Sequence, residues 1–105
     1  MKTKDIKTVD LIVLEWFDKT YGNSYFAAEI TVNYNLKNQR TIKMPFQYGY
    51  GNHSEHQAFK TIKKELNCFK KYEKNDSFWK VYRTEKIVYR YIKKENCLKR
   101  ELMNL

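Results

Sequence analysis

The chain has 105 residues, of which 42% are hydrophobic and 16% aromatic, with only 3 Gly and 1 Pro. This composition excludes a disordered tail, and the length is that of one small domain, which we place at residues 1–105. No apolar stretch approaches the roughly 18 residues of a membrane span, and no signal peptide is visible, so the sequence indicates a cytoplasmic protein with no membrane partner.

The formal charge of +9 is unevenly distributed along the chain. Residues 1–52 hold 7 basic and 5 acidic side chains, whereas residues 53–105 hold 14 and 7. The positive field therefore belongs mainly to the second half. Such a field favours partners with a negative surface, such as nucleic acid, a nucleoprotein complex or an acidic protein face.

Three strands are predicted in the first half. Residues 9–17 are a dense run of aliphatic and aromatic side chains, which is typical of a mostly buried strand. After turn-forming residues, positions 24–34 alternate apolar and polar, as the returning strand of a hairpin does. A third strand follows the same rule and carries Pro45, which lacks an N–H and so predicts a sheet edge. Its predicted apolar face consists of Ile42, Met44, Phe46 and Tyr48.

A helix is predicted next, from Ser54 to about Cys68. Ser54 and Gln57 have the spacing of a capping box, and two glycines break the preceding strand. Apolar side chains recur at intervals of three and four, which gives the helix one stripe to lay on the sheet. The stripe consists of Phe59, Ile62, Leu66 and Phe69, and Lys60, Lys64 and Lys71 fall on the opposite side.

The last third predicts two more strands and a short helix. Residues 78–83 are rich in aromatic and β-branched types and predict a fourth strand, and residues 87–92 predict a fifth. An alternative for the end of the chain is one long helix, lined by Val88, Ile92, Leu98, Leu102 and Leu105. We therefore expect an α+β fold, an antiparallel sheet in the order β-β-β-α-β-β with one main helix packed on it and a short C-terminal helix.

Basic and aromatic side chains mix in the second half. Cations neutralise phosphates, and exposed rings stack on unpaired bases for roughly 1 to 3 kcal/mol each. The predicted binding residues are Lys60, Lys64, Lys71, Arg83, Arg90, Lys93, Lys94, Lys99 and Arg100, with Tyr82 and Tyr89 as stacking rings. Lys63, Lys70 and Lys80 belong to the same mixture. The alternative is a strand with rings in the core and charges in solvent.

Sites for other chemistry have weak signals. The only histidines, His53 and His56, lie three helical turns before Cys68, too far for a zinc site, so we predict no metal, no cofactor and no catalytic residue. Residues 46–54 contain Gly49 and Gly51 before a helix start, which suits a phosphate cradle or, more simply, a tight turn. The two cysteines form no C-x-x-C pair and are expected to be free thiols.

Four segments resemble small proteins encoded by phages and mobile elements. They are residues 15–18 (EWFD), 22–26 (GNSYF), 46–51 (FQYGYG) and 98–102 (LKREL). The resemblance implies no specific activity, but small phage proteins commonly bind and block host machinery, including CRISPR effectors. We therefore expect a non-enzymatic protein that docks on RNA, DNA or a host nucleoprotein complex in the host cytoplasm, as an anti-defence inhibitor of anti-CRISPR type.

Two other functions remain open from the residues alone. A structural or oligomeric module would meet another protein chain, for example as a homodimer, through a sheet edge or an aromatic face. Its positive charge would then mainly keep the protein soluble, and the protein would not bind nucleic acid. An enzyme acting on nucleic acid would need His56 and a divalent metal, and the sequence has few acids and histidines in recognisable motifs.

Overall fold

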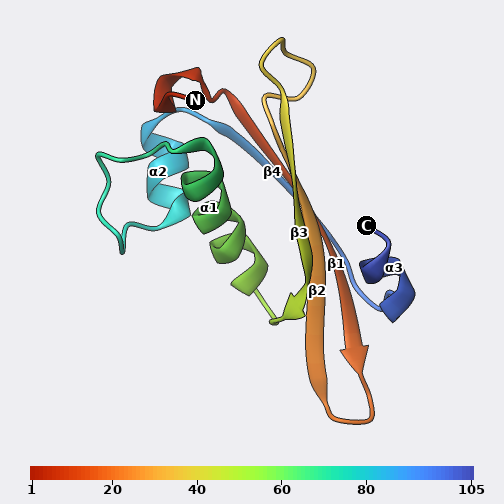
Figure 1. Cartoon of the computed structure of the whole chain (residues 1–105). Coiled ribbons are helices and arrows are strands. Elements are labelled where there is room, and N and C mark those ends of the chain that lie inside the picture. Colours follow the sequence, from red (N-terminus) through yellow and green to blue (C-terminus); the bar gives the residue numbers. More distant parts are fainter.

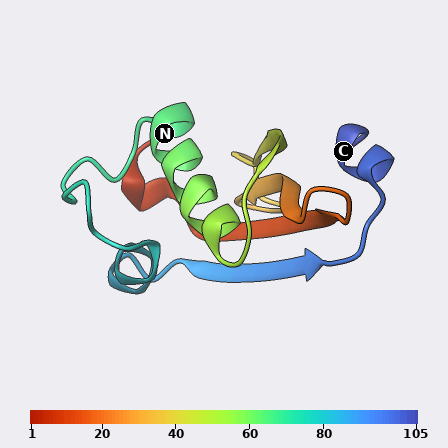
Figure 2. The same cartoon turned by 90° about the horizontal axis from the view of Figure 1, so that it is seen from below.

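The computed structural model describes residues 1–105 and confirms the predicted α+β class. Four strands form one sheet in the order β3-β2-β1-β4, with α1 and α2 on one face and α3 on the other (Figures 1 and 2). The elements are η1 (Thr3–Asp5), β1 (Thr8–Asp18), β2 (Asn23–Val32), β3 (Arg40–Tyr48), α1 (His53–Leu66), α2 (Phe78–Thr84), β4 (Val88–Lys94) and α3 (Lys99–Met103).

The first three strands form the predicted antiparallel meander. β1 pairs with β2 from Val9 opposite Val32 to Asp18 opposite Asn23. The tight turn between them uses Gly22, whose φ of 70° lies in the left-handed region that glycine adopts without strain. β3 lies at a sheet edge, as its proline predicts, because a missing N–H costs nothing where no neighbour needs it.

The predicted apolar face of β3 is half wrong because the strand contains a β-bulge. Ala28 pairs with Met44, but Phe26 pairs with Gln47, so β3 has one residue more than β2 between these pairs. Side chains alternate along a strand, so the extra residue reverses the faces that follow it. Phe46 and Tyr48 therefore lie on the side of the sheet opposite Met44, where both rings contact Tyr25.

Residues 78–83 belong to α2, and the predicted strand there is wrong. The buried side chains Phe78, Val81 and Tyr82 have helical spacing, and the Ser77 hydroxyl accepts an N–H from the first turn at 3.2 Å. A serine cap and an i, i+3, i+4 stripe thus override the strand preference of the residue types. None of the helices is both long and apolar enough to cross a membrane.

The final strand exists, but it runs parallel to its neighbour. β4 pairs with β1 from Thr8 opposite Val88 to Leu14 opposite Lys94, so the sheet is mixed and the predicted antiparallel order is wrong at this edge. A parallel pair needs a long connection that returns the chain to the same end of the sheet. Here α1, α2 and the intervening loop make that return (Figure 1).

α1 starts without the predicted capping box. The Ser54 hydroxyl is buried and has no hydrogen-bond partner, whereas the carbonyl of Asn52 accepts the N–H groups of Glu55 and His56 at 3.1 and 3.3 Å. The helix ends at Leu66, slightly before the predicted end. Its first turn is therefore closed by the backbone rather than by a serine side chain.

The main core lies between the sheet and the two helices α1 and α2. The predicted stripe of α1 is confirmed, since all four of its side chains are buried, although Phe69 follows the helix end. Aromatic rings fill the space between the helices, and the rings of Phe59 and Phe69 stack with centroids 5.6 Å apart. The largest fully buried side chains are Phe26, Phe69, Phe78, Ile6, Leu11, Ile30, Ile62 and Leu66.

The opposite face of the sheet is covered only at one end. There α3 buries Leu102 and Cys97 against Ala27, and half-buried Trp16 and Phe46 complete the cluster. At the other end Ile12 and Ile92 are register partners that stay 41% and 60% exposed. We call this second part the open sheet face.

The N-terminal segment holds the end of α1. The ammonium group of Met1 donates to the carbonyl of Leu66 at 3.1 Å, and the Thr3 hydroxyl accepts the N–H of Phe69 at 2.8 Å. The carbonyl of Leu66 belongs to the last turn of α1, where carbonyl groups lack partners inside the helix, and Phe69 lies just beyond it. These contacts fix the direction in which the chain leaves α1.

Candidate functional site

The predicted binding residues do not share one surface. Lys60 and Lys64 lie on α1, whereas Lys99 and Arg100 lie on α3, at the opposite end and on the opposite face of the sheet (Figures 1 and 2). Arg83 is exposed on α2. A single small ligand therefore cannot touch all of these residues.

Three of the predicted cations form ion pairs within the protein. The Lys71 ammonium lies 2.9 Å from a Glu85 oxygen, and the guanidinium Nε of Arg90 lies 2.5 Å from an Asp10 oxygen. Lys93 is 19% exposed and lies 2.9 Å from Glu15. Each of these charges is largely balanced by its partner, which weakens its attraction for an external anion.

The cations at the α3 end have different surroundings. Lys94 is exposed at the end of β4, and Arg100 is exposed on α3. The Lys99 ammonium lies over the rings of Trp16 and Phe46, at 5.5 and 5.8 Å from their centroids. Lys99 therefore contributes a cation–π contact to the α3 cluster.

The predicted stacking role of Tyr82 and Tyr89 is wrong. Tyr82 is 3% exposed, and its ring packs against Phe59 and Tyr89 with centroids 5.6 and 5.0 Å apart. The half-buried Tyr89 donates its hydroxyl hydrogen to the Glu55 carboxylate at 2.6 Å. Burial is the main cause that raises the pKa of both phenols. The Tyr82 ring belongs to the core, and the Tyr89 ring packs against it.

The structure gathers a different set of lysines around one hollow. The hollow has a volume of about 650 Å³ and lies where α1 ends and the following loop begins. We call it the lysine hollow. Its lining comprises Lys60, Lys63, Lys64, Lys70 and Lys74, with Asn67, Cys68, Phe69 and Tyr72 between them.

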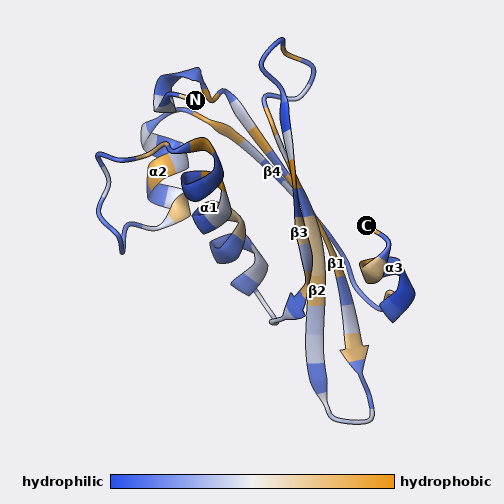
Figure 3. Ribbon diagram, viewed as in Figure 1, coloured by the Kyte–Doolittle hydropathy of each residue, from blue (hydrophilic) through white to orange (hydrophobic).

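Local backbone geometry explains how these lysines meet. The helical spacing of α1 turns Lys60 and Lys64 away from the sheet. Asn67 and Phe69 then adopt φ values of 51° and 59°, a left-handed conformation that reverses the chain. The loop that follows is mostly hydrophilic (Figure 3). Its residue Lys70 lines the same hollow as the lysines of α1.

None of the five ammonium groups of the lysine hollow forms an ion pair. Every ion pair of the protein involves another basic residue, and the nearby loop carboxylate of Asp76 binds Lys80 at 2.8 Å. Lys63 is the one member with an internal partner, because its ammonium lies 5.3 Å from the Phe59 ring centroid. The hollow therefore concentrates uncompensated positive charge.

A second hollow adjoins the first. It has a volume of about 570 Å³ and shares Asn67, Cys68 and Lys70 with the lysine hollow. Its other lining residues are Met1, Lys2, Thr3, Asp5 and Lys71. We call it the N-terminal hollow. The two hollows together form one basic surface that is interrupted by a single carboxylate, that of Asp5.

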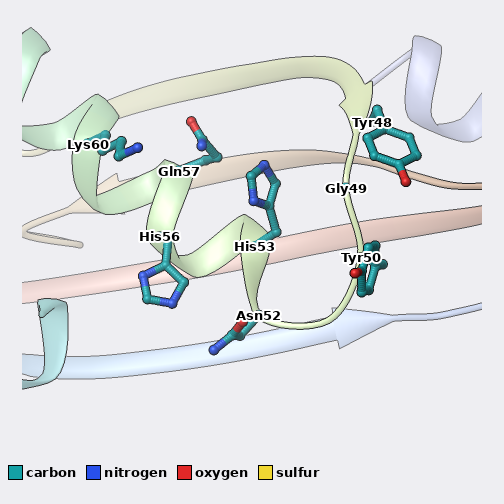
Figure 4. Close-up of a pocket in the computed structure, with 8 residues that line it drawn as sticks. All are labelled: Tyr48, Gly49, Tyr50, Asn52, His53, His56, Gln57 and Lys60. Carbon is teal, nitrogen blue, oxygen red and sulfur yellow. The ribbon is translucent and has the colours of Figure 1, made fainter.

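A third hollow of about 470 Å³ lies at the start of α1 (Figure 4). Gly49 is required there, because a Cβ atom would lie 2.5 Å from the His53 ring and 2.7 Å from that of Phe26. Figure 4 shows His53, Gln57 and Lys60 on one side of the helix and His56 on the other. Gly49 therefore permits the close packing of these rings, whereas Gly51, whose φ of 61° lies in the left-handed region, makes the turn into the helix.

The side chains with metal-binding chemistry are dispersed. The structure contains no group of three or more His, Cys, Asp or Glu side chains that could share a metal ion. Cys68 and Cys97 are both free and buried on opposite faces of the sheet.

Sequence reasoning missed two members of the basic surface. Lys74 was not selected because it lies in a polar loop without periodicity, and Lys2 because it lies far from the second half of the chain. The only available signal for Lys74 is local charge density, since Lys63, Lys64, Lys70 and Lys71 precede it within 11 positions. No sequence signal places the N-terminal segment at the end of α1.

The open sheet face, the lysine hollow and the N-terminal hollow are thus the surface features that require a function. No protein-family model, curated protein or solved structure matches the chain.

Proposed function

We propose that the protein is a non-enzymatic binding protein whose lysine hollow holds the phosphate backbone of a nucleic acid, RNA or DNA, free or within a host nucleoprotein complex. One observation carries the proposal: five lysines line one hollow and none of them forms an ion pair. Such a concentration of charge costs folding free energy through mutual repulsion, and an anionic ligand removes that cost.

The proposal has a quantitative signature. Each phosphate neutralised by a lysine releases condensed counterions, so the logarithm of the binding constant falls by about 0.9 per logarithmic unit of salt for each contact. Five contacts would give a slope of about −4.5. An acidic protein face lacks this condensed layer and would give a shallower dependence.

We also propose that the protein acts in the host cytoplasm as an anti-defence inhibitor. The two free, buried cysteines support a reducing compartment. The inhibitory role follows from the expected phage origin, because small phage proteins commonly bind and block host machinery. In that role the basic surface would occupy the nucleic acid of a defence complex and thereby block its use.

A salt titration with matched variants tests the binding. The triple variant K60E/K64E/K74E reverses three exposed lysines of the hollow, none of which has a hydrogen bond or ion pair to lose. The control K19E/K37E/R40E lowers the formal charge equally at three exposed positions away from the hollow. Both are compared with the wild-type protein on single- and double-stranded DNA and RNA.

The hollow variant should lose at least about tenfold in affinity, and its salt slope should flatten by about 3. The control should keep nearly the wild-type slope. Equal losses in both variants would mean that net charge alone attracts the ligand. An unchanged slope in the hollow variant would contradict the proposal.

A second candidate function is a homodimer formed through the open sheet face. The exposed pair Ile12 and Ile92 favours it, because these side chains lie next to each other beside an approximately 350 Å³ hollow. Sedimentation at low and high salt decides between the candidates. A salt-insensitive dimer that Ile92→Lys dissociates, together with no nucleic-acid binding, would favour this second function.

A further inference from the structure

We infer that the ligand of the basic surface is a double-stranded nucleic acid, held by its two phosphate rows across the lysine hollow and the N-terminal hollow. This inference rests on the proposed function. It adds that the protein contacts the phosphates of a duplex and makes no contact with the base edges.

The two hollows adjoin each other and are both lined by lysines. They share Asn67, Cys68 and Lys70, which therefore lie between them. The lysine hollow adds Lys60, Lys63, Lys64 and Lys74 on one side, and the N-terminal hollow adds Lys2 and Lys71 on the other. Cations thus lie on both sides of a common ridge. A duplex presents two rows of phosphates, whereas a single strand presents one.

The two aromatic side chains that line the lysine hollow are not available for stacking on bases. Phe69 is fully buried, and the half-buried Tyr72 donates its hydroxyl hydrogen to the Glu85 carboxylate. The Lys71 ammonium lies 5.4 Å from the Tyr72 ring centroid. Proteins that hold single strands offer free rings on which successive bases stack. Neither ring here is free for that role.

Exposed rings do occur in the protein, but they lie elsewhere. Tyr50 is 69% exposed at the other end of α1, and Figure 4 shows its ring and that of Tyr48 on the side of the Gly49 segment away from the helix. Trp79 is exposed on α2, where its ring packs edge-on against Tyr89. The strongest positive charge and the available stacking surfaces are thus separate.

Lysine also suits backbone contact without base recognition. Its ammonium group is a point charge on a flexible stem, whereas guanidinium and amide groups read base edges through paired hydrogen bonds. The two hollows contain seven lysines and no arginine. The expected binding is therefore independent of sequence.

Two paired neutralisations test the inference on a mixed-sequence duplex and on its separated strands. K60Q/K64Q removes charge from the lysine hollow, and K2Q/K71Q removes it from the N-terminal hollow. The control K19Q/K37Q removes the same charge from the two loops of the meander. A separate single variant, E85Q, tests Lys71 in the opposite direction. It removes the ion-pair partner of Lys71 and should therefore tighten duplex binding.

If a duplex spans both hollows, K60Q/K64Q flattens the duplex salt slope by about 2 and K2Q/K71Q by about 1, because Glu85 already balances much of the Lys71 charge. The control leaves the slope unchanged. The duplex should also bind more tightly than either strand. A slope that only K60Q/K64Q changes, or tighter binding of the single strands, would overturn the duplex while leaving the proposed function intact. Absence of salt-dependent binding to every nucleic acid would refute the proposed function itself.

Discussion

The two faces of the sheet are covered to very different extents. On the α1 and α2 face, 19 buried residues from both helices, from β1, β2 and β3 and from the connecting segments form one continuous cluster, and half-buried rings of β4 pack against it. On the α3 face only Ala27, Cys97 and Leu102 are buried, beneath a helix of five residues. The same strands therefore supply a deep core on one side and a small satellite cluster on the other.

This difference shows which face contributes most of the folding stability and which face can open locally. Burial of apolar area stabilises a fold in rough proportion to that area, so the helix face must contribute most of the free energy of unfolding. The α3 face can open at one end at low cost, because few side chains lie beneath that helix. Four measurements test this contrast and the stability of the helix face.

The largest expected effect is the loss of a ring from the helix face. Phe26 is 1% exposed, so Phe26→Ala removes buried area and leaves a cavity that should lower the free energy of unfolding by about 3 to 5 kcal/mol. Urea denaturation measures the change. The matched control Ile92→Ala, on the exposed part of the other face, should stay within about 0.5 kcal/mol. Similar losses from both would refute the contrast.

Thiol labelling should give the next largest effect. Cys97 becomes accessible when α3 detaches, whereas Cys68 belongs to the main core, and burial raises the pKa of its thiol to about 11. Cys97 should therefore react about a hundredfold faster with a thiol reagent under native conditions. Cys68→Ser and Cys97→Ser assign the two rates, and equal rates would show that both faces open together.

Leu102→Ala should have a smaller effect than Phe26→Ala. The substitution removes the main buried side chain of α3, but the helix can detach, so its docking energy limits the loss to about 2 kcal/mol. Amide exchange should accelerate in α3 and stay unchanged in β1. A loss as large as that of Phe26→Ala would mean that α3 folds as part of the main core.

The smallest expected effect is a pH dependence at the loop of the basic surface. The Tyr72 hydroxyl and then the Lys71 ammonium hold the pKa of Glu85 below its ordinary value of 4.5. A lowered folded pKa contributes stability above the unfolded pKa, and this contribution is lost as the pH falls through the folded value.

The difference in urea midpoint between the wild type and Glu85→Gln should therefore be constant near neutral pH and shrink below about pH 4.5. Glu65→Gln, at an exposed position without an ion pair, is the control and should show little pH-dependent difference. A difference that grows on acidification would have the wrong sign for this pairing.

Much of the fold could be predicted, because period and residue type agree over the first three strands and over α1. Strand prediction failed in β3 where a single inserted residue reversed the faces, and alternation cannot reveal such an insertion. It failed again at residues 78–83, where residue type favoured a strand. The spacing of Phe78, Val81 and Tyr82 after Ser77 was the better signal, because a cap and a buried stripe determine a short helix.

The candidate site could be predicted only in part. Lys60 and Lys64 follow from helical periodicity, which fixes their direction relative to the core. Lys70 and Lys74 depend on the left-handed conformation at Asn67 and Phe69, and Phe69 keeps it because its ring is buried and its N–H binds Thr3. That contact joins positions 66 residues apart, and no local pattern encodes it.

The parallel pairing of β1 with β4 has a consequence for the nascent chain. The meander of β1, β2 and β3 can form once the chain has been synthesised through Tyr48, but β1 gains its second neighbour only after Val88–Lys94 has been made. During that interval β1 presents an unpaired edge to solvent, and such an edge is a template for pairing with another chain. Aggregation should therefore compete with folding most strongly while α1 and α2 are being synthesised.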